Sequence, residues 1–196
     1  TETAKAKCDY GSYLASAGQN EEAARLMIQA LFSLAAEMAP TSPRLIDAQL
    51  QTAAVMRKLG NLATALDLER SAADAAVIAY QDDHPLRLVA EYNLATTQWE
   101  SQGAADGLAV LTSLEPRFAK RFGTNHASTM TVRISLAQAL LSQGESANRE
   151  QFVRLLLESF DAAKENVRRT MLDSSIDAAA RASVEIQRGV NIALST

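Results

Sequence analysis

The sequence has little of what interrupts a helix or cross-links a chain. It contains only four prolines, eight glycines and one cysteine in 196 residues, and 5% of its residues are aromatic. Long helices joined by short turns fit this composition, because proline and glycine are the residues that most disfavour a helix interior. The single Cys8 excludes an internal disulfide. That absence favours a reducing compartment, and we expect a cytoplasmic protein.

Signals for a membrane or for a nucleic acid are also missing. The longest apolar stretches are broken by charge well before the roughly 18 residues that a membrane helix needs. The N-terminus is polar and lacks the apolar core of a signal peptide. The net charge is −4, whereas a nucleic-acid-binding surface usually needs clustered basic residues. We therefore expect neither a membrane nor a nucleic acid as a partner.

No motif for catalysis or for a cofactor stands out. The sequence has no glycine-rich phosphate loop, no nucleophile elbow and no cysteine and histidine cluster with metal-ligand spacing. His84 and His126 stand beside predicted helix starts, where capping and packing explain them better than a metal or catalytic pair. Cys8 has no activating neighbour and is expected to be a small buried residue. We predict no enzyme activity, no metal and no cofactor.

What the sequence does contain is a repeat with a period of 42 residues. His84 and His126 lie 42 positions apart (126 − 84), and Gly18 and Gly60 show the same spacing (60 − 18). We number each unit from Ser42, His84 or His126 as repeat position 0, so that in the first unit the repeat position equals the residue number. Self-similarity at a fixed period of tens of residues is typical of solenoids, in which each unit packs on its neighbours.

Two repeat positions indicate how each unit is built. Position 11 is always small and is occupied by Gly11, Ala53, Ala95 and Ala137. Position 18 holds Gly18, Gly60, Gln102 and Gly144, with Gly103 directly after the exception. A small residue lets two helices pack closely, and a glycine at a helix end adopts the positive φ of a C-terminal cap. Each unit is therefore predicted to be two helices joined by a tight turn.

The units are expected at about residues 1–41, 42–83, 84–125 and 126–167. The apolar pattern predicts helices at about 2–17, 21–38, 43–58, 62–80, 85–101, 104–122, 126–142 and 148–167. Ser42 is expected to cap the third of these, with Pro43 at its first helical position. Pro116 lies inside the sixth, and we expect a kink or break near Glu115.

Residues 168–196 are expected to be a C-terminal capping helix or a truncated fifth repeat. Ser174 and Asp177 resemble a capping box, with aspartate in place of the usual glutamate, and predict a helix that reaches about Gln187. Ile176 and Val184 give that helix an apolar stripe.

The spacing of small residues resembles that of the tetratricopeptide repeat. Beyond positions 11 and 18, alanine recurs at positions 23 and 30 in the first two units, as Ala23, Ala30, Ala65 and Ala72. The period of 42 residues and the segment Asp83-His84-Pro85, echoed by Asn125-His126, resemble the long kinesin-light-chain subtype of this family. Asn93-Leu94-Ala95 is similar to the Asn-Leu-Ala of that subtype's first helix. The resemblance covers about residues 1–165.

The resemblance implies an all-α fold: an α-solenoid, wound as a right-handed superhelix of about four helix-turn-helix repeats plus a C-terminal helix. It also implies a concave groove, lined by the first helix of each unit, that binds a peptide or a partner domain. Repeat positions 5, 8, 9 and 12 would face this groove. The predicted groove residues are Lys5, Asp9, Ser12, Asp47, Leu50, Gln51, Ala54, Val89, Tyr92, Asn93, Thr96, Thr131, Ser135 and Gln138.

Position 9 is the most informative of these, because it is polar in all four units. It holds Asp9, Gln51, Asn93 and Ser135. Side-chain amides in such a row can bond the backbone of an extended peptide. The alternative interpretation is that position 9 simply faces solvent or bonds the neighbouring repeat.

Two functions follow from the sequence. The first is a non-catalytic scaffold that binds a protein or peptide through the concave face. The second is a regulatory or oligomerisation segment of a larger signalling enzyme, such as a kinase, an NTPase or a protease-like protein. The second hypothesis is motivated by a start without Met, by an incomplete last helix and by the leucines at 155–157, which could support self-association.

Overall fold

The computed structural model describes residues 2–102, 105–142 and 150–172, apart from residues 152 and 156, and its regular structure there is entirely helical. The helices are α1 (Glu2–Ser16), α2 (Asn20–Glu37), α3 (Pro43–Lys58), α4 (Leu62–Ala79), α5 (Pro85–Gln102), α6 (Ala105–Phe122) and α7 (Ala127–Ser142). A further helix covers residues 157–172. The all-α prediction is thus confirmed. The expected capping box and helix after residue 172, and Gly144, lie outside the described residues.

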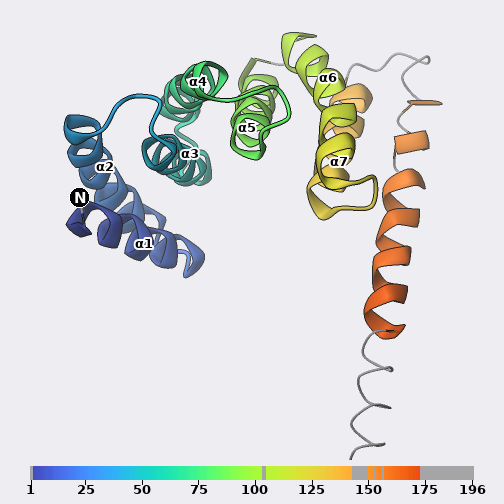
Figure 1. Cartoon of the computed structure of the whole chain (residues 1–196), viewed down its shortest axis with the longest axis horizontal. Coiled ribbons are helices and arrows are strands. Elements are labelled where there is room, and N and C mark those ends of the chain that lie inside the picture. The colour runs from blue at the N-terminus through green and yellow to red at the C-terminus, as the bar shows by residue number, and fades with distance from the viewer. Residues whose placement is uncertain (1, 103–104, 143–149, 152, 156, 173–196) are drawn as a thin grey trace, which may run out of the picture.

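The helices pack in the order of the chain. The first and second helices of a unit contact each other in the pairs α1–α2, α3–α4 and α5–α6, and α2–α3, α4–α5 and α6–α7 join one unit to the next. Figure 1 shows the result as a row of helix pairs that curves into an arch. This neighbour-on-neighbour packing is the predicted α-solenoid.

The direction of the curve follows from which helices meet across units. The first helices contact one another in the pairs α1–α3, α3–α5 and α5–α7. In contrast, no Cα atoms of α2 and α4, or of α4 and α6, lie within 8 Å of each other. A row whose first helices touch while its second helices stand apart must bend toward the first helices. Figure 1 accordingly shows α1, α3, α5 and α7 along the inner side of the arch.

Glycine ends the first helix of units one and two as predicted. Gly18 has φ +81° and Gly60 has φ +75°. The N–H of Gly18 bonds the carbonyl of Ala15, and the N–H of Gly60 bonds that of Arg57, which is the hydrogen bonding of a glycine C-terminal cap. Gly123 also has a positive φ, +101°, and ends α6 rather than a first helix.

The small residue at position 11 is a point of close helix contact. A Cβ on Gly11 would lie 2.6 Å from Cγ of Met27 on α2. In the third unit the glycine is on the other helix, where a Cβ on Gly107 would lie 2.8 Å from the carbonyl oxygen of Ala95. Between them, Ala53 and Ala65 are fully buried. The close approach predicted for position 11 is therefore confirmed, with position 23 as its partner.

Two local predictions are wrong. The break expected near Glu115 is absent, because α6 runs through Pro116 as one helix. Proline removes one backbone hydrogen bond, but Leu114 and Phe118 on either side are buried in the core and hold the helix together. Ser42 occupies the N-cap position of α3 before Pro43, yet its side chain makes no cap hydrogen bond. Its hydroxyl instead donates to the sulfur of Met38 at 3.6 Å.

Candidate protein-binding groove

The predicted groove residues lie on the inner row of helices, but not all of them reach the surface. At position 5, the side chains of Lys5, Asp47, Val89 and Thr131 are all exposed. At position 9, the four polar side chains are exposed or half-buried. Position 12 is mixed, since Thr96 is buried, Ser12 and Ala54 are half-buried and Gln138 is exposed. At position 8 the side chains become more exposed along the row: Cys8 and Leu50 are buried, Tyr92 is half-buried and Ile134 is exposed.

Hydrogen bonds link the first helices of adjacent units through these positions. The Ser12 hydroxyl on α1 donates to Oε1 of Gln51 on α3 at 2.8 Å, and Gln51 donates to Asp47 at 2.7 Å. Further along, the hydroxyls of Tyr92 on α5 and Ser135 on α7 are 2.8 Å apart. For Gln51 and Ser135, position 9 thus bonds the neighbouring repeat, which is the alternative interpretation of the polar row.

The other two members of position 9 behave differently. Neither the Asp9 nor the Asn93 side chain makes a hydrogen bond to the rest of the described chain. Both residues are on first helices, where Asp9 is exposed and lines a hollow and Asn93 is half-buried. Position 9 therefore alternates along the row, from unbonded Asp9 to bonded Gln51 to unbonded Asn93 to bonded Ser135.

A hollow of about 420 Å³ is lined by the first two units and by Leu86 at the start of α5. Its lining combines two cations, two carboxylates, an amide and apolar side chains: Lys5, Cys8, Asp9, Leu34, Pro43, Arg44, Asp47, Ala48, Gln51 and Leu86. Four of these, Lys5, Asp9, Asp47 and Gln51, are predicted groove residues. The structure thus brings residues from α1 and α3 together around one depression.

The Cys8 thiol in this hollow is not an activated nucleophile. Burial raises the pKa of Cys8, and the nearby carboxylates of Asp9 and Asp47 raise it further. A thiol needs the opposite shift to react, because the thiolate is the nucleophile. The predicted role of Cys8 as a small buried residue fits its position.

Both histidines cap and pack, as predicted. Nδ1 of His84 accepts the backbone N–H of Leu86 at 3.3 Å, and its ring stacks on Tyr80 with centroids 3.9 Å apart. One unit later, Nδ1 of His126 accepts the N–H of Ser128 at 3.1 Å, and its ring lies against Phe122. In the residues that the structure describes, no three His, Cys, Asp or Glu side chains gather as a metal site.

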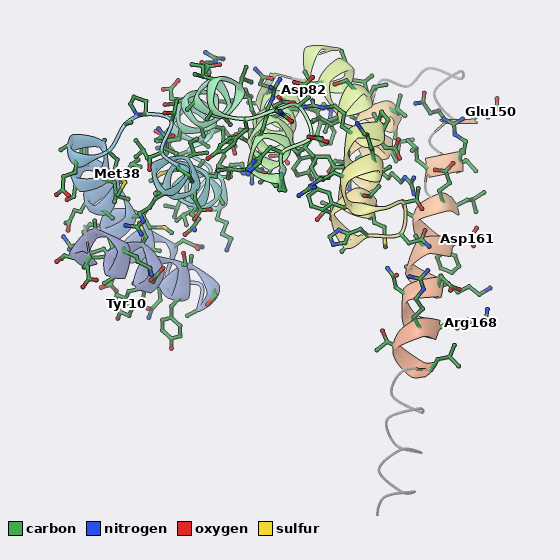
Figure 2. The ribbon with its side chains drawn as sticks, in the orientation of Figure 1. Tyr10, Met38, Asp82, Glu150, Asp161 and Arg168 are labelled. Atoms are coloured by element: carbon green, nitrogen blue, oxygen red, sulfur yellow. The ribbon has the colours of Figure 1, made fainter. Side chains whose placement is uncertain are left out.

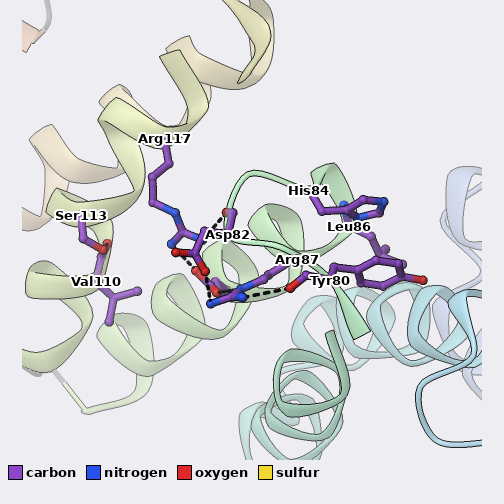
Figure 3. Close-up of polar contacts among 9 residues, drawn as sticks. Tyr80, Asp82, His84, Leu86, Arg87, Val110, Ser113 and Arg117 are labelled. Atoms are coloured by element: carbon purple, nitrogen blue, oxygen red, sulfur yellow. Dashed lines mark hydrogen bonds and ion pairs between the residues drawn. The ribbon is translucent and has the colours of Figure 1, made fainter. Parts of the chain in front are cut away.

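Sequence reasoning missed an ion-pair network that joins the α4–α5 turn to α6 (Figure 3). Arg87 pairs with Asp82 and with Glu91, at 2.7 Å in each case, and also donates to the carbonyl of Tyr80 at 3.0 Å. Arg117 on α6 pairs with the other oxygen of Glu91. The spacing of Arg87 and Glu91, four residues apart on one helix, was the only local signal for it. The network fixes the turn between units two and three.

The ends of the array expose apolar side chains. Figure 2 shows Tyr10 at one end, near the start of the inner row, and Arg168 on the last described helix at the other. Tyr10 and Tyr13 stack with centroids 6.2 Å apart and are 53% and 65% exposed.

None of the helices in the described ranges is long and apolar enough to cross a membrane.

Comparisons with known proteins identify the architecture. No protein-family model and no curated protein matches the sequence. Among solved structures, a single-residue variant of a Podosopora anserina protein, described as a kinesin light chain with nearly identical TPR-like repeats, is similar. It is 19% identical with a TM-score of 0.70, over 84% of this chain and 76% of that one. The structure of that protein without the substitution gives a TM-score of 0.67 at 19% identity, over 83% and 76% of the two chains.

The chain therefore has the fold of a TPR-like repeat solenoid, as the spacing of its small residues indicated. Its assignment to the long 42-residue subtype rests on the sequence period and stays a prediction. At this level of identity the similarity defines the fold, so the function has to be argued from the inner face itself.

Proposed function

We propose that this protein is a non-catalytic scaffold that binds a protein or peptide on the inner face of α1, α3, α5 and α7. The observation that carries the proposal is the hollow on that face, lined by Lys5, Asp9, Asp47 and Gln51 from two adjacent first helices. TPR-like folds in general mediate contacts between proteins. The proposal includes four units and a C-terminal element with the boundaries given above, a cytoplasmic location, and no nucleic acid, membrane or cofactor.

An extended segment suits the chemistry of this face better than a compact ligand. The polar atoms of Asp9 and Asn93 recur at two-unit spacing and are not used within the array. Asp9 can accept backbone N–H groups, and the Asn93 amide can both donate and accept. Hydrogen bonds to a peptide backbone would supply affinity with little demand on peptide sequence.

Sequence preference would come from the hollow. Lys5 and Arg44 line it together with Asp9 and Asp47, so both signs of charge are present. A bound segment with acidic and basic side chains in complementary order would be favoured over one with a single charge sign. The half-buried Leu86 adds apolar surface for one hydrophobic side chain.

The test uses peptides selected from a random display library against the whole chain. Asp9→Ala combined with Asn93→Ala is expected to weaken binding at least about tenfold, since each lost hydrogen bond contributes about 1 kcal/mol. The matched control is Asp67→Ala with Asp74→Ala, two exposed carboxylates on α4, on the outer side of the arch. Equal affinity of both variants for the selected peptides would refute the groove assignment.

A broader variant tests the row as a whole. Substituting Gln51, Tyr92 and Asn93 together is expected to abolish binding while the array stays folded, as checked by circular dichroism. Tyr92 also packs on Phe118, so Tyr92→Phe keeps the ring and removes only the hydroxyl. Binding that survives this triple change would mean that the partner uses another face.

The second candidate, a regulatory or oligomerisation segment, is favoured by the last described helix. At position 34 the residues Leu34, Ala76 and Phe118 are at most 2% exposed, but Phe160 is 70% exposed. Leu157 and Met171 on the same helix are 60% and 68% exposed. Several large apolar side chains exposed on one helix favour an interface. Light scattering tests this candidate: self-association that Phe160→Glu abolishes supports it, and a strict monomer counts against it.

A further inference from the structure

A carboxylate occupies the core at the junction between units two and three. Glu69 on α4 is fully buried, and it lies at repeat position 27. The same position holds Met27 in the first unit and Leu111 in the third, both at most 1% exposed and both apolar. Glu69 thus stands where the first and third units bury a hydrocarbon side chain, whereas Val153 at this position of the fourth unit is 45% exposed.

The residues around Glu69 depart from the repeat in the same way. Position 15 holds Ala15 and Trp99 elsewhere, but in unit two it is Arg57, whose Nε lies 3.5 Å from Oε1 of Glu69. On the other side, Thr97 of α5 lies at position 13 and faces Glu69 of the preceding unit. At the other two junctions this position holds Val55, in a buried cluster with Met27 of the preceding unit, and Ala139, in a buried cluster with Leu111 of the preceding unit. Three polar replacements therefore coincide at one junction out of three.

The polar cluster is incompletely paired. By distance and angle, neither oxygen of the Glu69 carboxylate accepts a hydrogen bond, and the Nε of Arg57 and the hydroxyl of Thr97 are likewise buried without one, although the Thr97 hydroxyl is near enough to favour the charged carboxylate. An ionised carboxylate held this way in a core is costly, because the loss of hydration is only partly offset by one guanidinium. A protonated, neutral carboxyl in the same place is far less costly.

The charged and titratable groups that face Glu69 come from both neighbouring helices. Arg57 faces it from α3, and Thr97 and Glu100 face it from α5. Burial raises the pKa of Glu69 from 4.5 to about 7; the Thr97 hydroxyl and the Arg57 charge lower it, and Glu100 raises it. The carboxyl therefore changes charge close to neutral pH while it remains inside the junction.

We propose that Glu69, with Arg57 and Thr97, is a proton-operated joint between the second and third helix pairs of the array. The junction is tightly closed when Glu69 is neutral and loosens when Glu69 ionises and draws in water. Arg57 also reaches α5 next to the inner face, because its Nη1 lies 3.5 Å from the hydroxyl of Thr96, a predicted groove residue that is itself buried. The joint exists whether or not that face binds a peptide.

The sign of the effect follows from proton linkage. Between pH 4.5 and about 7 the folded junction keeps a proton on Glu69 that an opened chain releases. Raising the pH through this window therefore removes stability from the closed junction, and lowering it restores that stability. This is the reverse of an ordinary ion-paired carboxylate, which stabilises a fold at high pH.

Amide hydrogen exchange on the whole chain, corrected for intrinsic rates, tests the joint at pH 5.5 and pH 8. Protection of the amides of α4 and α5 is expected to fall by about tenfold or more at the higher pH, since one pKa unit corresponds to a tenfold change. In Glu69→Gln the loss should vanish, because the amide cannot ionise. The matched control, Glu22→Gln, changes a carboxylate on α2 that is 51% exposed and should keep the full pH response.

Two results would overturn the proposal: protection at the junction that does not change with pH in the unaltered chain, or a pH response that persists in Glu69→Gln. If the glutamine variant fails to fold, Glu69→Met provides the second measurement, because methionine is the residue at the equivalent position of the first unit. A distance between spin labels on α1 and α7 should report the same change. It is expected to vary with pH in the unaltered chain and to be constant in either variant.

Discussion

The first two and the last two helix pairs use one repeat position for the same purpose with different chemistry. Position 7 links a first helix to a second helix throughout. In units one and two the links are exposed: Lys7 bonds Gln29, and Gln49 bonds Ser71. In units three and four they are ion pairs. Glu91 pairs with Arg117 in unit three, and Arg133 pairs with Glu158 of its own unit at 3.6 Å and with Glu115 of the preceding helix α6 at 2.7 Å. The repeat thus conserves the contact between helices while the side chains that make it vary.

The two halves also differ in how they fill the core. The first half packs alanine against leucine and methionine, as around Ala53, Ala65 and Met27. The second half adds rings, and Phe118 lies 6.1 Å from Tyr92 and 5.6 Å from Phe122 between ring centroids. The difference teaches that the period fixes where helices meet, while residue size can change from unit to unit.

The largest expected effect distinguishes the ion pairs at position 7 from the exposed hydrogen bonds at the same position. Arg133 is 8% exposed and pairs with Glu115 at 2.7 Å, so Arg133→Ala leaves a largely buried carboxylate without its partner. We expect a loss of about 3 kcal/mol in the free energy of unfolding. Gln49→Ala, the matched change in unit two, should cost about 1 kcal/mol or less. Urea denaturation of both variants measures the difference, and equal losses would show that position 7 does not distinguish the two halves.

A smaller effect is expected at the close contact between positions 11 and 23. Gly107→Ala places a methyl group 2.8 Å from the backbone oxygen of Ala95, which cannot move without shifting a helix. Gly11→Ala meets Cγ of Met27, the flexible part of a side chain. We expect about 2 kcal/mol of destabilisation for Gly107→Ala and about 1 kcal/mol for Gly11→Ala. Thermal unfolding of the two variants checks the order, and a larger loss for Gly11→Ala would reverse our view of which half is packed more rigidly.

The smallest effect concerns the hydrogen bonds between first helices. Tyr92→Phe removes the bond to Ser135 but keeps the ring in the core, and should cost about 1 kcal/mol. Ser12→Ala removes the bond to Gln51 near the other end of the row, where Gln51 still bonds Asp47 and can bond water. We expect less than about 0.5 kcal/mol there. Denaturant midpoints of the two variants, measured side by side, should show this ranking.

Much of the fold could be predicted because its signals are local. Helix α3 begins and ends at the expected Pro43 and Lys58, and Gly18 and Gly60 adopt the positive φ that their place after a helix requires. The continuity of α6 through Pro116 could not be predicted in this way. It depends on the burial of Leu114 and Phe118 against other helices, and such tertiary contacts are not part of a residue's helix propensity.

The candidate site was only partly accessible to sequence reasoning. The resemblance to the tetratricopeptide repeat was enough to predict Asp9, Asp47 and Gln51 for the groove, but the burial of Leu50 and Thr96 depends on how closely adjacent first helices approach. The Glu69 cluster was missed because each of its residues is unremarkable by itself. A comparison of positions 13, 15 and 27 between units would have exposed it, since unit two places an acid where units one and three place Met27 and Leu111.

The neighbour-only packing of the helices has a consequence for how this protein comes apart. In the described part of the chain, each helix from α1 to α7 touches only helices one or two places away along the sequence. Weakening the contact between two neighbouring helix pairs therefore does not destabilise the whole molecule, in contrast to a protein with a single core. A sufficiently weakened joint would divide the array into two blocks that melt separately. The melting curve of a damaged variant would then have two steps, and the size of each step would reveal where along the arch the damage lies.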